Sequence, residues 1–220
     1  MYTVRENHII SNKILQGGIS MKGTKKGFTL IELIVVIAII GVLAAILVPA
    51  LMGYIEKSHN SYDISNAKAL RDAVIEGISE GEYEESEIIS SPYDTPSATS
   101  GLTTRAYIYV DNNEIRVSNY RIAEILQDAG YISGIGNPPA TFTPTEYVFR
   151  GNHITLKCKS KTKWVRYQIN FANYADGEFK VTYAATDRSG SGLPDARASS
   201  EFAKKCGGTA TTDINLGAAD

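Results

Sequence analysis

The hydrophobic pattern of the chain is most extreme near its N-terminus. No Asp, Glu, Lys, Arg or His occurs from Leu33 to Ile55, an uncharged run of 23 residues. A helix of this length extends about 34 Å, which is enough to cross the hydrocarbon core of a bilayer. Because the apolar core of a cleaved secretory signal has only about 7–15 residues, the run predicts a membrane-spanning helix instead.

The helical pattern continues beyond this run but becomes amphipathic. Apolar side chains recur at spacings of three or four residues, at Ile64, Ala67, Leu70, Val74 and Ile78. Such a stripe predicts a helix that packs one face on a folded domain. We therefore expect one long helix from Phe28 to about Gly81, apolar on all sides over residues 28–55 and amphipathic over residues 56–81.

Residues 82–220 are expected to form a globular domain. An acidic and then Ser-, Thr- and Pro-rich stretch at its start has no periodicity and predicts a loop of about twenty residues. Two alternating runs around residues 111–113 predict a β-hairpin. A short helix follows, which Ser118 or Asn119 can cap and Gly130 can stop.

Later segments predict the rest of an antiparallel sheet. One hairpin is expected to turn at Gly151 and Asn152, and strands are expected over residues 163–171 and 178–184. The apolar side chains that alternate along the last two strands are Val165, Tyr167, Ile169 and Phe171, then Phe179, Val181 and Tyr183. A meander with one buried face, covered by the helix stripe, is an α+β fold. Residues 185–220 have little periodicity and predict a C-terminal tail.

Several features separate the uncharged run from a plain membrane anchor. Lys25 and Lys26 precede it, which predicts that its N-terminal side stays in the cytoplasm and that the following domain is outside. Glu32 lies at its start, where a carboxylate is unfavourable in hydrocarbon. Gly41 weakens the helix, and Pro49 removes one of its backbone hydrogen bonds. A simple anchor needs none of these residues.

The segment KKGFTLIELIVVIAIIGVLAAILVPALMGYI resembles the N-terminal signature of type IV pilins and the related pseudopilins. The resemblance implies a class III signal that a prepilin peptidase cuts between Gly27 and Phe28, followed by N-methylation of Phe28. It also implies that Glu32 pairs with the Phe28 amine of a neighbouring subunit and fixes the register of assembly. A helix kink or local melting is implied at Gly41 and Pro49, and the fold implied is the pilin-like α+β architecture.

Physical reasoning gives Glu32 two possible roles. An unpaired charge in an apolar core is costly, so a cationic amine from the next subunit is a favourable partner. Near the first turn, however, a carboxylate can also cap its own helix. Gly41 and Pro49 likewise allow either a simple packing kink or local melting.

The resemblance further implies the partners and the location of the chain. The expected partners are other copies of the chain in a helical homopolymer, with hetero-subunits possible, the prepilin peptidase, and an inner-membrane assembly platform. The subunit would span the cell membrane once before assembly and then enter an extracellular filament. Residues 1–27 form the leader, and the short basic leader from Met21 indicates that translation starts there.

Composition limits the other possibilities. The net charge is −2, and removal of residues 1–27 leaves 17 Lys and Arg against 23 Asp and Glu, which argues against general nucleic-acid binding. No catalytic, cofactor or metal-binding motif is present, so neither an enzyme nor a metalloprotein is expected. Cys158 and Cys206 are too far apart for a zinc or redox motif, and they can be either a disulfide or two free thiols.

Three functions remain from the sequence. The first is a structural subunit of a type IV pilus, used for adhesion, motility or DNA uptake. The second is a pseudopilin of a type II secretion-like or competence system. The third, a membrane-anchored binding domain, explains neither the Gly27–Phe28 site nor Glu32. The large outer domain and its Ser-, Thr- and Pro-rich loop favour the displayed surface of a pilus.

Overall fold

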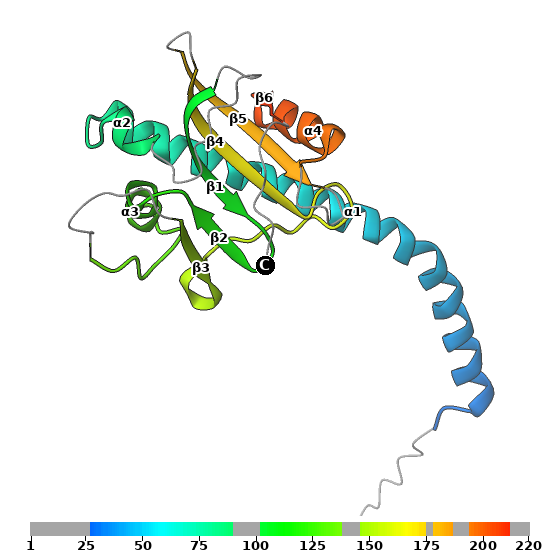
Figure 1. Cartoon of the computed structure of the whole chain (residues 1–220). Helices are drawn as coiled ribbons and strands as arrows, with labels where there is room; N and C mark the ends of the chain where they lie inside the picture. Colours follow the sequence, from blue (N-terminus) through cyan, green and yellow to red (C-terminus); the bar gives the residue numbers. More distant parts are fainter. Residues whose placement is uncertain (1–26, 90–101, 138–145, 175–177, 187–193, 212–220) are drawn as a thin grey trace, which may run out of the picture. The chain divides into compact units, whose positions relative to one another are not determined.

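The structure is a computed structural model that describes residues 27–89, 102–137, 146–174, 178–186 and 194–211 (Figure 1). It divides into two units, one ending at Leu47 and one beginning at Val48. The first unit contains the start of helix α1 (Leu30–Ser79), and the second contains the remainder of α1 and the other described elements.

Helix α1 confirms the long helix expected from the sequence. It begins at Leu30 and ends at Ser79, just before Gly81, whose φ of 75° is accessible to glycine without strain. The predicted apolar stripe faces the protein interior in the second unit. Ala67, Leu70 and Val74 are fully buried, while the stripe residues at either end, 64 and 78, are partly buried.

In the described residues, six strands form one sheet. The strands are β1 (Leu102–Val110), β2 (Glu114–Val117), β3 (Tyr147–Arg150), β4 (Arg166–Tyr174), β5 (Phe179–Thr186) and β6 (Thr209–Ala210). Their order is β3-β2-β1-β4-β5-β6, and all neighbours are antiparallel except β5 and β6. The α+β fold with an antiparallel sheet is therefore confirmed, and the parallel strand β6 is an addition to it.

Three shorter α-helices and one 3-10 helix complete the described elements. They are α2 (Glu85–Ile88), α3 (Tyr120–Asp128), α4 (Ala196–Cys206) and η1 (Gly151–His153). Helix α3 starts as predicted, because the Asn119 side chain accepts a hydrogen bond of 3.0 Å from the Ile122 N–H. The predicted loop over residues 82–101 contains α2 up to residue 88, and most of its remainder lies outside the described residues.

Helices α1 and α4 cover the same face of the sheet (Figure 1). From α4, Phe202 stacks on Tyr167 of β4 with ring centroids 4.9 Å apart. From α1, Arg71 donates to the Tyr183 hydroxyl of β5 at 3.4 Å. Residues 167 and 183 are on one face because β4 and β5 pair Tyr183 with Ile169. This face holds the main core, as the alternating pattern indicated.

The expectation of a single buried sheet face is wrong along β4. Gln168 and Asn170 lie on the opposite face, and each is only 1% exposed. Their burial is tolerated because the Gln168 amide donates to Asn170 at 2.6 Å, and Asn170 donates to the Thr182 carbonyl at 3.4 Å. The alternation of apolar residues along a strand identifies one buried face. It does not identify polar side chains that are buried on the other face and hydrogen-bond to each other.

The predicted hairpin that turns at Gly151 and Asn152 is also wrong. These residues begin η1, and the chain then forms only an isolated bridge, between Ile154 and Ile132. Residues 155–163 form no strand, because several of their N–H groups bind carboxylates of α1 instead of a neighbouring strand.

Two carboxylates of α1, two turns apart, hold this segment. Asp63 is fully buried and accepts hydrogen bonds from the Lys159 N–H at 2.7 Å, the Ser160 N–H at 2.8 Å and the Trp164 indole N–H at 3.0 Å. One oxygen of Glu56 accepts from the N–H groups of residues 161 and 162 at 3.1 and 3.0 Å and from the Thr162 hydroxyl at 2.7 Å. We call residues 158–162 the clasped segment.

The two carboxylates respond differently to their surroundings. Burial raises the pKa of Asp63 above its ordinary value, and its hydrogen bonds only partly oppose this effect. Burial also acts to raise the pKa of Glu56, but the hydrogen bonds from Thr162, Lys161 and Ser160 outweigh it and lower that pKa.

Helix α4 corrects the prediction of an irregular C-terminal tail. It starts at the Asp195 cap, which accepts from the Ala198 N–H at 2.6 Å, and it ends at Gly207 with φ 79°. Its buried residues are Ala198, Ser199, Phe202, Ala203 and Cys206. This spacing of three or four residues is present in the sequence. The apolar periodicity is weak, however, because small and polar residues occupy much of the buried face.

Replacement of Asp63 by Ala is expected to lower the free energy of unfolding of the outer domain by about 2–4 kcal/mol. The change leaves buried N–H donors of residues 159, 160 and 164 without an acceptor. Chemical denaturation of the detergent-solubilised chain measures the effect. The exposed Glu76→Ala change on the same helix is the control and should shift the value by less than about 0.5 kcal/mol. Equal effects of both changes would contradict the role of Asp63.

A second prediction concerns the stability of the outer domain at acidic pH. Because the pKa of Glu56 is lowered in the folded chain, its contribution to stability is complete above its ordinary pKa, about 4.3, and is lost as pH falls through the folded pKa. Glu56→Gln should therefore flatten the decline in unfolding free energy between about pH 5 and 3. Glu76→Gln is the exposed control. Parallel pH curves for wild type and Glu56→Gln would show the prediction to be wrong.

Candidate functional site

The predicted cleavage point lies in an open segment just before α1. Gly27 and Phe28 are outside the helix, and Phe28 is 90% exposed. A Cβ atom added at Gly27 would meet no atom within 4 Å, so the described residues leave open space beside Gly27. The remainder of the leader, residues 1–26, lies outside the described residues.

Glu32 forms a reciprocal cap with Thr29 at the start of α1. The Thr29 N–H and the Thr29 hydroxyl each donate to Glu32 Oε2 at 2.8 Å. In return, the Glu32 N–H donates to the Thr29 hydroxyl oxygen at 3.3 Å. This is a capping box, which satisfies N–H groups that the first helical turn leaves unpaired. Oε1 takes part in none of these bonds.

The capping box shows that Glu32 can serve its own helix, which was one of the two roles left open by the sequence. It leaves the other role available, because the carboxylate is exposed and its Oε1 takes part in none of the capping bonds. The role assigned to Glu32 in subunit register stays a prediction. Sequence reasoning gave no part to Thr29, although a Thr three residues before a Glu is the signature of a capping box.

The side chains that follow Glu32 form an exposed apolar surface. Leu30, Ile34, Ile40, Leu47 and Ile55 are examples, with exposures of 76, 49, 58, 64 and 47%. Within the described residues, α1 is the one helix that is long and apolar enough to cross a membrane. Exposed hydrophobic surface of this extent marks an interaction with lipid or with other protein.

Gly41 and Pro49 both lie inside α1, which continues through them. A Cβ atom added at Gly41 would meet nothing within 4 Å. The glycine is therefore not required by packing within the described chain. Whether the helix kinks or melts at these positions in an assembly stays a prediction.

Cys158 and Cys206 are both buried, and the structure has them as free thiols. Cys158 Sγ donates to Asp63 Oδ2 at 3.4 Å. Burial and the adjacent Asp63 raise the pKa of Cys158, and burial raises the pKa of Cys206 to about 12. Both shifts favour the protonated thiol at neutral pH. The structure does not contain the possible disulfide between Cys158 and Cys206, and that pairing stays a prediction.

The sequence also gave no indication of the clasped segment. No role was assigned to Glu56 or Asp63 from the sequence, yet both are tied to residues 159–162. Their spacing of seven residues puts them on one face, which is a weak signal by itself. The partners are about a hundred residues away in sequence, so no local pattern could identify them.

Known proteins resemble the chain in two ways. A family model described as the prokaryotic N-terminal methylation motif matches residues 22–48, which include the capping box and the start of the apolar surface. The type IV major fimbrial protein FimA of Dichelobacter nodosus is 47% identical over 62 residues, which are 28% of this chain and 39% of that protein. The chain thus aligns with about two fifths of the length of such relatives.

A fimbrial protein of Pseudomonas aeruginosa gives a longer match. It is 32% identical over 152 residues, which are 67% of this chain and 94% of that protein. No solved structure gives a significant match. The methylation motif, the open Gly27–Phe28 segment, the capped apolar helix and the helix-covered antiparallel sheet all agree with this longer match, and together they show that the chain belongs to the type IV pilin family.

Proposed function

We propose that this chain is a structural subunit of a type IV pilus and polymerises through α1 after cleavage between Gly27 and Phe28. Its function is to build a filament, and no catalytic step is assigned to it. The relatives named above are fimbrial proteins, which supports a pilus over the pseudopilus of a secretion or competence system.

The observation that carries this proposal is the exposed apolar surface of α1. Full burial of a Leu, Ile or Val side chain is worth about 1.5–3 kcal/mol. Many such side chains between Leu30 and Ile55 are about half or more exposed, so water is an unfavourable environment for this segment. A bilayer solvates it before assembly, and neighbouring helices replace the lipid in a filament.

The leader sets the orientation of the subunit in this proposal. Lys22, Lys25 and Lys26 remain on the cytoplasmic side, and the outer domain faces away from the cytoplasm. The prepilin peptidase then cuts after Gly27, and the Phe28 amine becomes the new N-terminus and is methylated. An assembly platform in the membrane extracts the subunit and adds it to the fibre.

Glu32 supplies the register of assembly. In a lone subunit the carboxylate caps its helix through Thr29. In the fibre core its charge faces the cationic Phe28 amine of the next subunit. Because the core is otherwise apolar over residues 33–55, any other axial offset leaves both charges unpaired. The penalty for unpaired charges therefore selects one offset.

The proposal predicts the composition of filaments sheared from cells. Mass spectrometry of the sheared fraction should find abundant chain that begins at N-methylated Phe28 and contains no leader peptide. A peptidase-deficient strain is the control and should retain the uncut chain in the membrane. Recovery of mature chain only from the membrane fraction, with none in filaments, would contradict the pilus function.

Two single substitutions separate the roles of Glu32. Glu32→Gln keeps an acceptor for the capping box but removes the charge, whereas Thr29→Val removes the capping hydroxyl and keeps the charge. We expect Glu32→Gln to be processed normally but to reduce the filament yield about a hundredfold, because the Phe28 amine is left unpaired. Thr29→Val should still assemble. Normal filaments from Glu32→Gln, with loss of filaments in Thr29→Val, would assign Glu32 to capping alone.

A further inference from the structure

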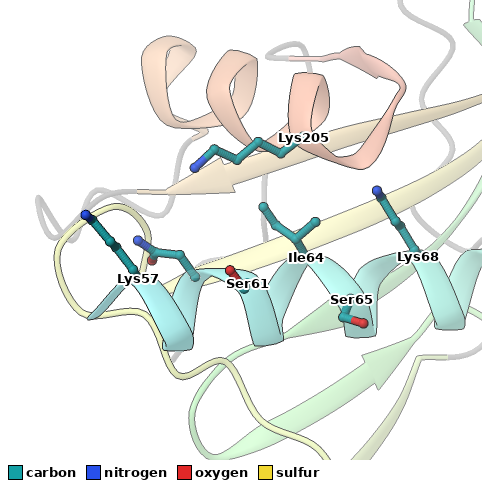
Figure 2. Close-up of a pocket in the computed structure, with 7 residues that line it drawn as sticks. Lys57, Ser61, Ile64, Ser65, Lys68 and Lys205 are labelled. Carbon is teal, nitrogen blue, oxygen red and sulfur yellow. The ribbon is translucent and has the colours of Figure 1, made fainter. Parts of the chain in front are cut away.

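A basic groove lies between α1 and α4 and belongs to none of the features described above (Figure 2). Its volume is about 570 Å³, and it is lined by Lys57, Asn60, Ser61, Ile64, Ser65, Lys68 and Lys205. Figure 2 shows Lys57, Ile64 and Lys68 extending from α1 toward α4, which contributes Lys205. We call these seven residues the lysine groove.

The polar groups of the lysine groove are arranged for a ligand that carries negative charge. Its lining contains three lysines and no carboxylate. Glu201 of α4 bridges Lys205 at 3.2 Å and Lys163 at 3.1 Å, so it offsets part of the positive charge. Asn60 is 8% exposed, and among the described residues its Oδ1 has no hydrogen-bond partner. A ligand N–H could supply that partner.

The same chain carries a surface of opposite charge beyond the end of α1. Glu80, Glu82 and Glu84 are exposed there, and Glu124 and Asp128 of α3 face the same region around Tyr83. We call these five acidic residues the acidic end. Burial, and after it the charges of Glu124, Asp128 and Glu82, raise the pKa of Tyr83 to about 12. Arg121 bonds to Glu124 and Glu87 and neutralises only part of it.

These two surfaces cannot meet within one subunit. Lys57 and Glu80 are 23 positions apart, and a helix extends about 35 Å over that distance. Lys68 is nearer, but about 18 Å of helix still separates it from Glu80. Parallel subunits displaced along a common axis by about 18–35 Å would bring the acidic end of one copy next to the lysine groove of another. The Glu32–Phe28 contact spans only four residues, about 6 Å of helix, so the two contacts join different pairs of subunits.

We infer that the lysine groove binds the acidic end of a second copy of this chain and so forms a subunit contact of the filament. The inference rests on the proposed polymerisation and adds an outer contact to the one made by Glu32. Charge complementarity within one sequence favours this partner, because each subunit supplies both surfaces. Anionic lipid headgroups are the other chemistry that three lysines attract, and the test distinguishes the two.

Charge exchange in the full-length chain tests the contact. Lys57→Glu combined with Lys68→Glu should lower the sheared-filament yield at least about tenfold, because like charges then face each other. Glu80→Lys combined with Glu82→Lys should do the same. All four substitutions together should restore the yield to within about twofold of wild type. Lys204→Glu, an exposed change on α4 outside the groove, is the matched control and should leave the yield unchanged.

Zero-length carbodiimide cross-linking of wild-type filaments gives an independent measurement. Mass spectrometry should find Lys57 joined to Glu80, Glu82 or Glu84, a link that one subunit cannot make.

Filaments without such links, or undiminished filaments from the Lys57→Glu, Lys68→Glu variant, would overturn the contact while leaving the proposed function intact. If that variant instead lost only binding to phosphatidylglycerol vesicles, the groove would be assigned to headgroups. Absence of wild-type filaments would overturn the proposed function and this contact together.

Discussion

The structure depends above all on an apolar helical surface that its own chain leaves exposed. From Leu30 to Ile55 the large side chains of α1 are exposed to solvent by about half or more. Such a helix is stable only in lipid or among other helices. We propose that the basic leader delivers this surface to a membrane, that cleavage after Gly27 creates a cationic terminus, and that Glu32 provides the charge that this terminus meets.

The second half of α1 differs from the first, because it packs against a folded domain. Its apolar stripe contributes Ala67, Leu70 and Val74 to the core, as any amphipathic helix would. The buried Asp63 and the half-buried Glu56 add directional bonds, which hold residues 159–162 in one position. The outer domain is thereby joined to the helix through both packing and hydrogen bonds.

The sequence predicted those elements whose signals are local. The length and stripe of α1, the hairpin of β1 and β2, and the Asn119 cap of α3 all follow from patterns within a few residues. The cleavage and methylation residues also come from a short motif, and they stay predictions. The hairpin predicted at Gly151 failed because the N–H groups beyond it bind carboxylates about a hundred residues away. Helix α4 was missed because Ala and Ser fill much of its buried face. The structure of such segments depends on partners that are distant in the sequence, and no local pattern identifies those partners.

The proposed assembly depends on an ion pair between Glu32 of one subunit and the Phe28 amine of the next, in an otherwise apolar core. Electron cryomicroscopy of sheared filaments, with helical reconstruction at side-chain resolution, can show this pair. We expect the Phe28 nitrogen of one subunit within about 4 Å of the Glu32 carboxylate of the next, which is the distance of an ion pair. A filament in which Glu32 bonds only to its own Thr29, with the Phe28 amine of the next subunit elsewhere, would contradict it.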